Sequence, residues 1–90
     1  MREASVNVVN RLGLHARAAA KLVRTAAKFK SRIILVEPKR DLTADAKSIL
    51  SILSLSASIG TTLSLKAEGE DEITAINEVI LLFKDGFGEL

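Results

Sequence analysis

The residues best suited to chemistry lie at positions 13–20, which read GLHARAAA and contain the only histidine of the 90-residue chain. The alanine-rich run after His15 favours a helix that begins there. A helix N-terminus presents free backbone N–H groups and a partial positive charge, which together suit a phosphate. The same field disfavours imidazolium, so we expect the His15 ring to stay neutral and to keep a nitrogen lone pair. A neutral imidazole beside an anion-binding cradle can accept a phosphoryl group.

Neighbouring residues support this interpretation of His15. Arg17 lies within reach of a group carried by His15 and can donate two parallel hydrogen bonds to phosphate oxygens. Gly13 allows a close approach to the backbone, and the small side chains of Ala16 and Ala18 leave the N–H groups open. Taken singly, a lone histidine at such a place is more often a cap or a surface residue, and most arginines are solvated. The combination of these residue types favours a phosphoryl-accepting site at His15.

The elements that must position these residues follow from periodicity and turn signals. Strands show alternating or β-branched apolar residues, and helices show apolar residues three and four positions apart. We expect strands at 3–9, 33–37, 42–43 and 61–68. The first helix is expected at 16–30, and a short second helix begins at a cap, Asp45 or Ser48, and ends at 55. The last helix is expected to begin with the acidic segment 69–72 and to end at Gly86. This βαββαβα order predicts an antiparallel or mixed sheet with the helices packed on one face.

The apolar stripes predict which side chains form the core. On the first helix the predicted stripe is Ala16, Ala19, Ala20, Val23, Ala26 and Ala27. On the last helix it is Ile73, Ile76, Val79, Ile80 and Phe83. On the first and last strands the inward residues are Ala4, Val6 and Val8, and Leu63, Leu65 and Ala67. Because the chain has only three aromatic residues, this core is expected to be aliphatic.

Composition predicts one small domain, 1–90, because 48% of the residues are apolar and 90 residues leave no room for a second core. The chain has no cysteine and one histidine, so we expect no disulfide, no metal and no cofactor. Residues 48–65 carry no charge, but their many Ser and Thr residues and Gly60 argue against a membrane span. With no apolar signal segment at the start, we expect a soluble, cytoplasmic monomer.

The net charge of +2 conceals an asymmetry between the two halves of the chain. Residues 1–47 carry 11 Lys/Arg and 4 Asp/Glu, a net +7, whereas residues 48–90 carry 2 and 7, a net −5. A basic half suggests an acidic partner surface or a nucleic acid. Alternatively, the opposite charges interleave on the folded surface and have no functional meaning. The near absence of aromatic residues weakens the case for single-stranded RNA, and we expect no nucleic-acid partner.

Three segments, taken together, resemble one known family. GLHAR at 13–17 is similar to the active-site segment of HPr, the histidine-containing phosphocarrier of the bacterial phosphoenolpyruvate-dependent phosphotransferase system. AKSIL at 46–50 is similar to that family's regulatory serine segment, and GEDE at 69–72 to the entry of its last helix. The resemblance covers nearly the whole chain. It implies an α+β fold, an open-faced β-sandwich in which a four-stranded antiparallel sheet carries three helices on one face.

The resemblance also implies roles for individual residues. His15 would accept a phosphoryl group from enzyme I on its Nδ1 atom and pass it to an enzyme IIA, and Arg17 would stabilise that group. Ser48 matches a serine that a kinase phosphorylates in some bacteria, which implies a serine kinase or phosphorylase as a further partner. From the residues alone, Ser48 is a helix N-cap. The partner-binding residues implied by the resemblance are Ala20, Arg24, Ile49, Leu50 and Leu53.

The chain departs from the family's usual pattern at a few positions. Ala18 replaces a proline that suits the first turn of a helix, Ser51 and Ser56 stand where glycines are common, and Ala27 replaces a basic residue. None of these changes removes a chemical group that phosphoryl transfer needs. Two other functions remain open on the sequence. One is a small regulatory binding domain, which the basic half supports; the other is a corepressor-type relative without relay activity, against which His15 and Arg17 together argue.

Overall fold

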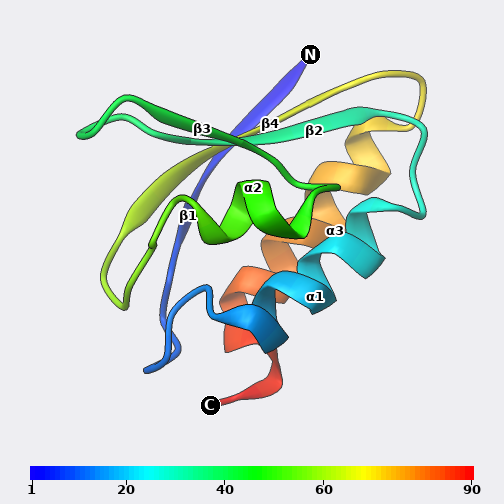
Figure 1. Cartoon of the computed structure of the whole chain (residues 1–90). Coiled ribbons are helices and arrows are strands. Elements are labelled where there is room, and N and C mark those ends of the chain that lie inside the picture. Colours follow the sequence, from blue (N-terminus) through cyan, green and yellow to red (C-terminus); the bar gives the residue numbers. More distant parts are fainter.

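A computed structural model describes the whole chain, residues 1–90, and places three α-helices on one face of a four-stranded sheet. The elements are, in chain order, β1 (Arg2–Asn7), α1 (Ala16–Ala26), β2 (Arg32–Glu37), β3 (Leu42–Asp45), α2 (Ile49–Leu53), β4 (Thr62–Glu68) and α3 (Glu72–Lys84), followed by a 3₁₀ turn, η1 (Gly86–Gly88). The predicted βαββαβα order is confirmed. Figure 1 shows the helices together beneath the sheet, whose other face is bare.

The sheet has the strand order β1-β4-β2-β3, and every neighbouring pair is antiparallel. This confirms the open-faced antiparallel sandwich and excludes the mixed sheet. Strands β1 and β2 run parallel to each other on either side of β4, so the chain between them must cross the sheet, and α1 makes that crossing. The register pairs Val6 with Leu63 and Leu35 with both Leu65 and Ala44.

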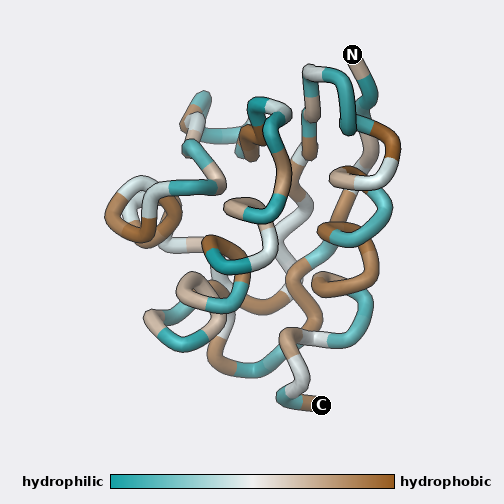
Figure 2. The backbone as a smooth tube through the Cα atoms, turned by 90° about the vertical axis from the view of Figure 1, so that its right-hand side faces the viewer, coloured by the Kyte–Doolittle hydropathy of each residue, from teal (hydrophilic) through white to brown (hydrophobic).

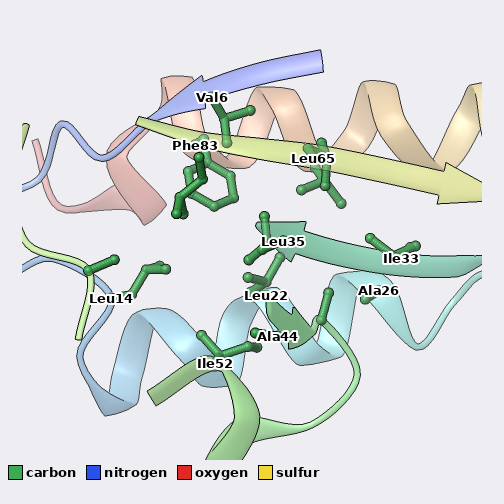
Figure 3. Packing of buried hydrophobic residues seen from close by; sticks show 14 of the residues in the cluster. Val6, Leu14, Leu22, Ala26, Ile33, Leu35, Ala44, Ile52, Leu65 and Phe83 are labelled. Atoms are coloured by element: carbon green, nitrogen blue, oxygen red, sulfur yellow. The ribbon is translucent and has the colours of Figure 1, made fainter. Parts of the chain in front are cut away.

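The core lies between the sheet and the helices, as the strand patterns predict. Val6 and Val8 of the first strand region and Leu63, Leu65 and Ala67 of β4 are buried, and Ala4 is half-buried. Figure 3 shows Leu22 of α1 and Ile52 of α2 below Leu35, and Phe83 of α3 close to Val6 of β1, all of them buried. Figure 2 shows hydrophobic and hydrophilic residues alternating along the chain, which is how each element presents one face to this core.

The predicted apolar stripe of α1 was partly wrong. Ala16 and Ala27 are exposed, and Ala20 and Val23 are only half-buried. The side chains that α1 buries are Ala18, Ala19, Leu22 and Ala26. Leu22, the largest apolar residue available on this face, is fully buried, and its neighbours four positions away in each direction are buried with it. Burial of leucine removes more apolar area than burial of alanine, so it sets the helix rotation.

The stripe of α3 also needs one correction. Ile73 is 54% exposed, whereas the small residue Ala75 is fully buried. The predicted burial of Val79 and Phe83 is confirmed. Ala75 shares its face of the helix with Val79 and Phe83, each four residues further on, because side chains at that spacing align along a helix.

Several predicted boundaries were wrong by a few residues. Helix α1 ends at Ala26 and not at 30, because the N–H groups of Lys30 and Ser31 donate to the carboxylate of Asp71 and are not available to a helix. Strand β1 stops at residue 7, β3 extends to residue 45, and α2 ends at residue 53. Helix α3 ends at Lys84 with Asp85 as its C-cap, and Gly86 follows at φ +57°, so it ends the helix as predicted and also begins the 3₁₀ turn.

Candidate functional site

His15 is the N-cap residue of α1 and has an extended backbone (φ −75°, ψ 178°). Its carbonyl oxygen accepts the first helical hydrogen bond, from the N–H of Ala19 at 2.8 Å. The side chain makes no capping hydrogen bond. Instead, the ring turns toward the end of the chain, where Nε2 lies 2.6 Å from Oε2 of Glu89. With 26% of its side chain exposed, the ring remains accessible from solution.

The first turn of α1 leaves backbone N–H groups open beside His15. The amides of Ala16, Arg17 and Ala18 have no backbone partner, as is usual for the first turn of a helix. Ala16 and Arg17 are exposed. Ala18 does not serve the purpose expected of it, because its side chain is fully buried and packs in the core. Access to the helix start is therefore through Ala16 and Arg17.

Gly13 allows a close approach, but the neighbour is the protein itself. Gly13 has φ +68°, and a Cβ atom there would lie 2.5 Å from the carbonyl oxygen of Ala57. The next residue, Leu14, donates its N–H to the same oxygen at 2.9 Å. Gly13 thus fixes the loop that leads into His15 against residues 57–58.

The side chain of Arg17 is exposed and makes no hydrogen bond or ion pair within the protein. It lines an open cleft of about 510 Å³ beside His15, together with Arg11, Leu12, Lys21, Gly88 and Glu89. Three cationic side chains therefore border one cleft, and Glu89 is the only acid in its lining. An unpaired guanidinium in this position is free to bind an anion.

The carboxylate of Glu89 is held from two sides. Oε1 accepts a 2.9 Å hydrogen bond from Nδ2 of Asn10, which also donates to the carbonyl of Gly13 at 2.8 Å. The Asn10 hydrogen bond, followed by the contact with His15, lowers the pKa of Glu89 below its usual value of 4.5, although burial opposes this. An ionised carboxylate can only accept, so Nε2 of His15 must carry a proton. In the neutral ring, Nδ1 then holds the lone pair.

Of the two predicted candidates, Asp45 and Ser48, it is Ser48 that is the N-cap of α2. Its Oγ accepts a hydrogen bond of 3.3 Å from the N–H of Ser51. The Oγ of Ser51 in turn accepts from the N–H of Asp45 at 2.9 Å, which ties the start of α2 to the end of β3. Ser56 has φ +47°, a glycine-like conformation, at a position where the sequence departs from the family's usual glycine.

The side chains predicted to bind partners lie on α1 and α2, which pack side by side (Figure 1). Leu50 is 77% exposed and Ile49 is 39% exposed. Arg24 is exposed, whereas Ala20 and Leu53 are half-buried. Leu12, which was not predicted, is 68% exposed on the same cleft as Arg17. The structure therefore places exposed apolar side chains both on α2 and beside the His15 loop.

The rest of the molecule contains neither a cluster of metal ligands nor a membrane-spanning helix. No three His, Cys, Asp or Glu side chains come together in a way that could hold a metal ion. None of the helices has the length and apolar character needed to cross a membrane.

Comparison of this sequence with known proteins identifies its family. Residues 2–85 match the sequence model of the family described as the PTS HPr component phosphorylation site. The chain belongs to the HPr family. The phosphocarrier protein HPr of Xylella fastidiosa is 45% identical over 89 residues, covering 99% of this chain and 98% of that protein. The phosphocarrier protein NPr of Shewanella violacea is 37% identical and covers 97% of this chain and 93% of its own length.

The fold of this HPr-family chain agrees with a solved structure of the family. The crystal structure of HPr-C-His from Thermoanaerobacter tengcongensis matches with a TM-score of 0.93 at 43% identity, covering 100% of this chain and 99% of that one. HPr proteins are phosphocarriers of the phosphotransferase system and not catalysts. The resemblance found in the sequence is thereby confirmed.

Sequence reasoning missed the residues that surround the His15 ring in this HPr-family chain. Glu89 lies 74 positions from His15, and no spacing rule connects them. Asn10 is read most simply as part of the turn after β1. The only local signal is the GFGE run at 86–89, in which two glycines and one acid follow the last helix. Such a run predicts a turn, but it does not predict that the turn places the Glu89 side chain against the His15 ring.

Proposed function

We propose that this chain carries a phosphoryl group from one protein to another. His15 accepts the group from enzyme I, with phosphoenolpyruvate as the ultimate donor, and passes it to an enzyme IIA. The observation that best supports this is the 2.6 Å contact between His15 Nε2 and the carboxylate of Glu89. It leaves Nδ1 as the nitrogen with a lone pair, on an accessible ring at the open start of a helix.

The geometry supports a simple division of labour in the transfer. Nδ1 of His15 attacks phosphorus, and the guanidinium of Arg17 binds the phosphoryl oxygens with up to two parallel hydrogen bonds. The open amides of Ala16 and Arg17 add a partial positive charge. Phosphoryl transfer depends mainly on alignment and charge stabilisation, and the donor and acceptor proteins supply the remaining alignment. A modest cradle suits a carrier that must also release the group.

The proposed docking surface consists of Ala20, Arg24, Ile49, Leu50 and Leu53. Exposed apolar side chains on α2 provide a contact that loses water on binding, and Leu50 is the most exposed of them. Arg24 and the cations of the His15 cleft suit a partner with an acidic surface. Both enzyme I and an enzyme IIA would use this one surface, because His15 must face each of them in turn.

We also propose that Ser48 is a regulatory phosphorylation site for a serine kinase. A phosphate on Ser48 would add about two negative charges next to Ile49 and Leu50. An acidic partner would then be repelled from the apolar contact. The capping role is compatible with this proposal, because the hydroxyl of a cap already lies at the end of the helix that favours an anion.

The test is incubation with phosphoenolpyruvate and enzyme I, followed by intact-mass measurement. We expect the addition of one phosphoryl group that is lost in acid, as phosphohistidine is. His15→Ala should not be labelled, and Ser48→Ala, the control for serine phosphate, should be labelled as the wild type is. Labelling of His15→Ala with unchanged acid lability would refute the proposal.

A further inference from the structure

Residues 85–90 fold back against the start of α1 and bring a carboxylate to the His15 ring. Figure 1 shows the red end of the chain beside the blue beginning of α1. The link consists of the 2.6 Å contact between Glu89 Oε2 and His15 Nε2. This contact joins the two ends of the sequence at the proposed phosphorylation site.

The turn that delivers Glu89 is strained and firmly anchored. Phe87 has φ 56° and ψ 29°, a left-handed conformation that bulky residues rarely adopt. Its side chain is only 1% exposed and packs edge to face on Phe83, with ring centroids 4.9 Å apart. Lys21 of α1 donates a 2.6 Å hydrogen bond to the carbonyl of Phe87. Strain of this kind persists only where the surroundings hold it, and it gathers at functional sites.

Asn10 holds the other oxygen of Glu89, and its orientation is unambiguous. Nδ2 donates both to Glu89 Oε1 and to the carbonyl of Gly13. The side-chain oxygen of Asn10 is buried and has no hydrogen-bond partner. Turning the amide over would place that oxygen against two acceptors, so the observed orientation is the only one that binds Glu89. The two hydrogen bonds from Nδ2 therefore fix the Glu89 carboxylate relative to the loop at Gly13.

We propose that Glu89 is a positioning residue for phosphoryl transfer, whose carboxylate holds the Nε2 proton of His15 and so presents Nδ1 to the phosphoryl donor. The proposal rests on the proposed function of His15. It assigns to Asn10 the placement of Glu89, and to Lys21 and Phe87 the placement of the turn.

Phosphoryl transfer to and from His15 needs no reactant besides the donor and acceptor proteins. The Nδ1 lone pair forms the N–P bond as the bond between phosphorus and the donor's leaving group breaks, and that electron pair stays with the donor. The His15 ring keeps its Nε2 proton and becomes positively charged, directly opposite the negative charge of Glu89. On transfer to the acceptor the N–P bond breaks and the pair returns to Nδ1. Glu89 remains ionised throughout.

The surroundings keep Glu89 in the form that this role requires. Arg11, Arg17 and Lys21 border the same cleft, and no second acid lines it. The hydrogen bond from Asn10, then the contact with His15 and the charge of Arg17, hold the pKa of Glu89 below its usual value. The carboxylate is therefore available at neutral pH, where the protein is expected to work.

The first experiment uses the unphosphorylated protein, so it does not depend on the relay. The chain has one histidine, so labelling histidine with ¹⁵N gives one pair of ring nitrogen signals. We expect a slowly exchanging proton on Nε2 in the wild type and its loss by rapid exchange in Glu89→Ala. Glu3→Gln removes an exposed carboxylate outside this network and should leave the proton signal unchanged.

The second experiment measures the rate of phosphorylation by enzyme I and phosphoenolpyruvate. We expect Glu89→Ala to be slower by about 10- to 100-fold, the range for loss of a hydrogen bond to a charged group. Glu89→Gln keeps the shape of the side chain and an acceptor oxygen, so its phosphorylation rate should lie between those of the wild type and Glu89→Ala. Because it preserves the packing, it distinguishes loss of the carboxylate from a folding defect. A persisting Nε2 proton in Glu89→Ala, or an unchanged rate, would overturn the proposal. If the wild type itself takes up no phosphoryl group, the proposed function fails instead, while the proton measurement still reports on Glu89.

Discussion

Arg17→Ala tests the guanidinium in isolation, because the side chain of Arg17 is exposed and makes no hydrogen bond or ion pair within the protein. A hydrogen bond to a charged group is worth about 1.5–3 kcal/mol. Since about 1.4 kcal/mol corresponds to a tenfold rate change, losing one such bond to the transferring group should slow transfer about 10- to 100-fold. The free energy of unfolding should change by less than about 0.5 kcal/mol. For a domain of this size the melting temperature should then shift by less than about 4 °C.

The assay is the initial rate of phosphorylation by enzyme I, with melting followed by circular dichroism. Arg17→Lys keeps the charge but loses the planar fork, and it should fall between wild type and Arg17→Ala. Arg32→Ala is the matched control, because Arg32 is an exposed arginine in β2 on the far side of the sheet from the helices. A rate within twofold of the wild type would refute the role of Arg17 in transfer. A large fall in melting temperature would show a structural role instead.

Three further predictions concern the loop, the acid stability and the regulatory serine. Gly13→Ala should lower the free energy of unfolding by more than about 1 kcal/mol, because its Cβ would lie 2.5 Å from the Ala57 carbonyl oxygen at φ +68°; an unchanged denaturation midpoint would contradict this. The hydroxyl of Ser31, and then nearby amides, lower the pKa of Asp71 from 3.8 to about 2. Ionised Asp71 therefore stabilises the fold at any pH above its pKa in the unfolded chain, and this stabilisation is lost as the pH falls toward 2. Asp71→Asn should therefore be less stable at neutral pH and lose less stability across that window in urea melts; parallel pH profiles would argue against it. Ser48→Asp should bind enzyme I more weakly than Ser48→Ala in calorimetric titrations, and equal affinities would leave only the capping role.

The sequence predicts the architecture well because its patterns are local. Alternation in β1 and β4 correctly places Val6 and Leu65 in the core, and the Ser48 cap correctly marks the start of α2. The order of the strands in the sheet did not follow from composition and spacing, since it depends on which strands pair over long distances. The family resemblance implied only that the sheet is antiparallel and carries three helices on one face, and the order β1-β4-β2-β3 is known from the structure alone.

The errors in the prediction have physical causes in tertiary contacts. Helix α1 lacks its expected last turn because the N–H groups of Lys30 and Ser31 donate hydrogen bonds to Asp71, which lies far along the chain. Its buried face is set by Leu22, which the alanine pattern obscured. The same reasoning explains why Glu89 escaped notice. A strained turn at the far end of the chain places it beside His15, and no local pattern specifies that placement.

The most direct test of phosphoryl transfer through His15 is to identify the atom that carries phosphorus. The protein would be labelled with ¹⁵N-histidine, phosphorylated by enzyme I and phosphoenolpyruvate, and examined by ³¹P and ¹⁵N spectroscopy, where the single histidine makes the assignment unambiguous. We expect a bond from phosphorus to Nδ1 of His15, with the proton still on Nε2. Phosphorus on Nε2, or on a residue other than His15, would contradict it.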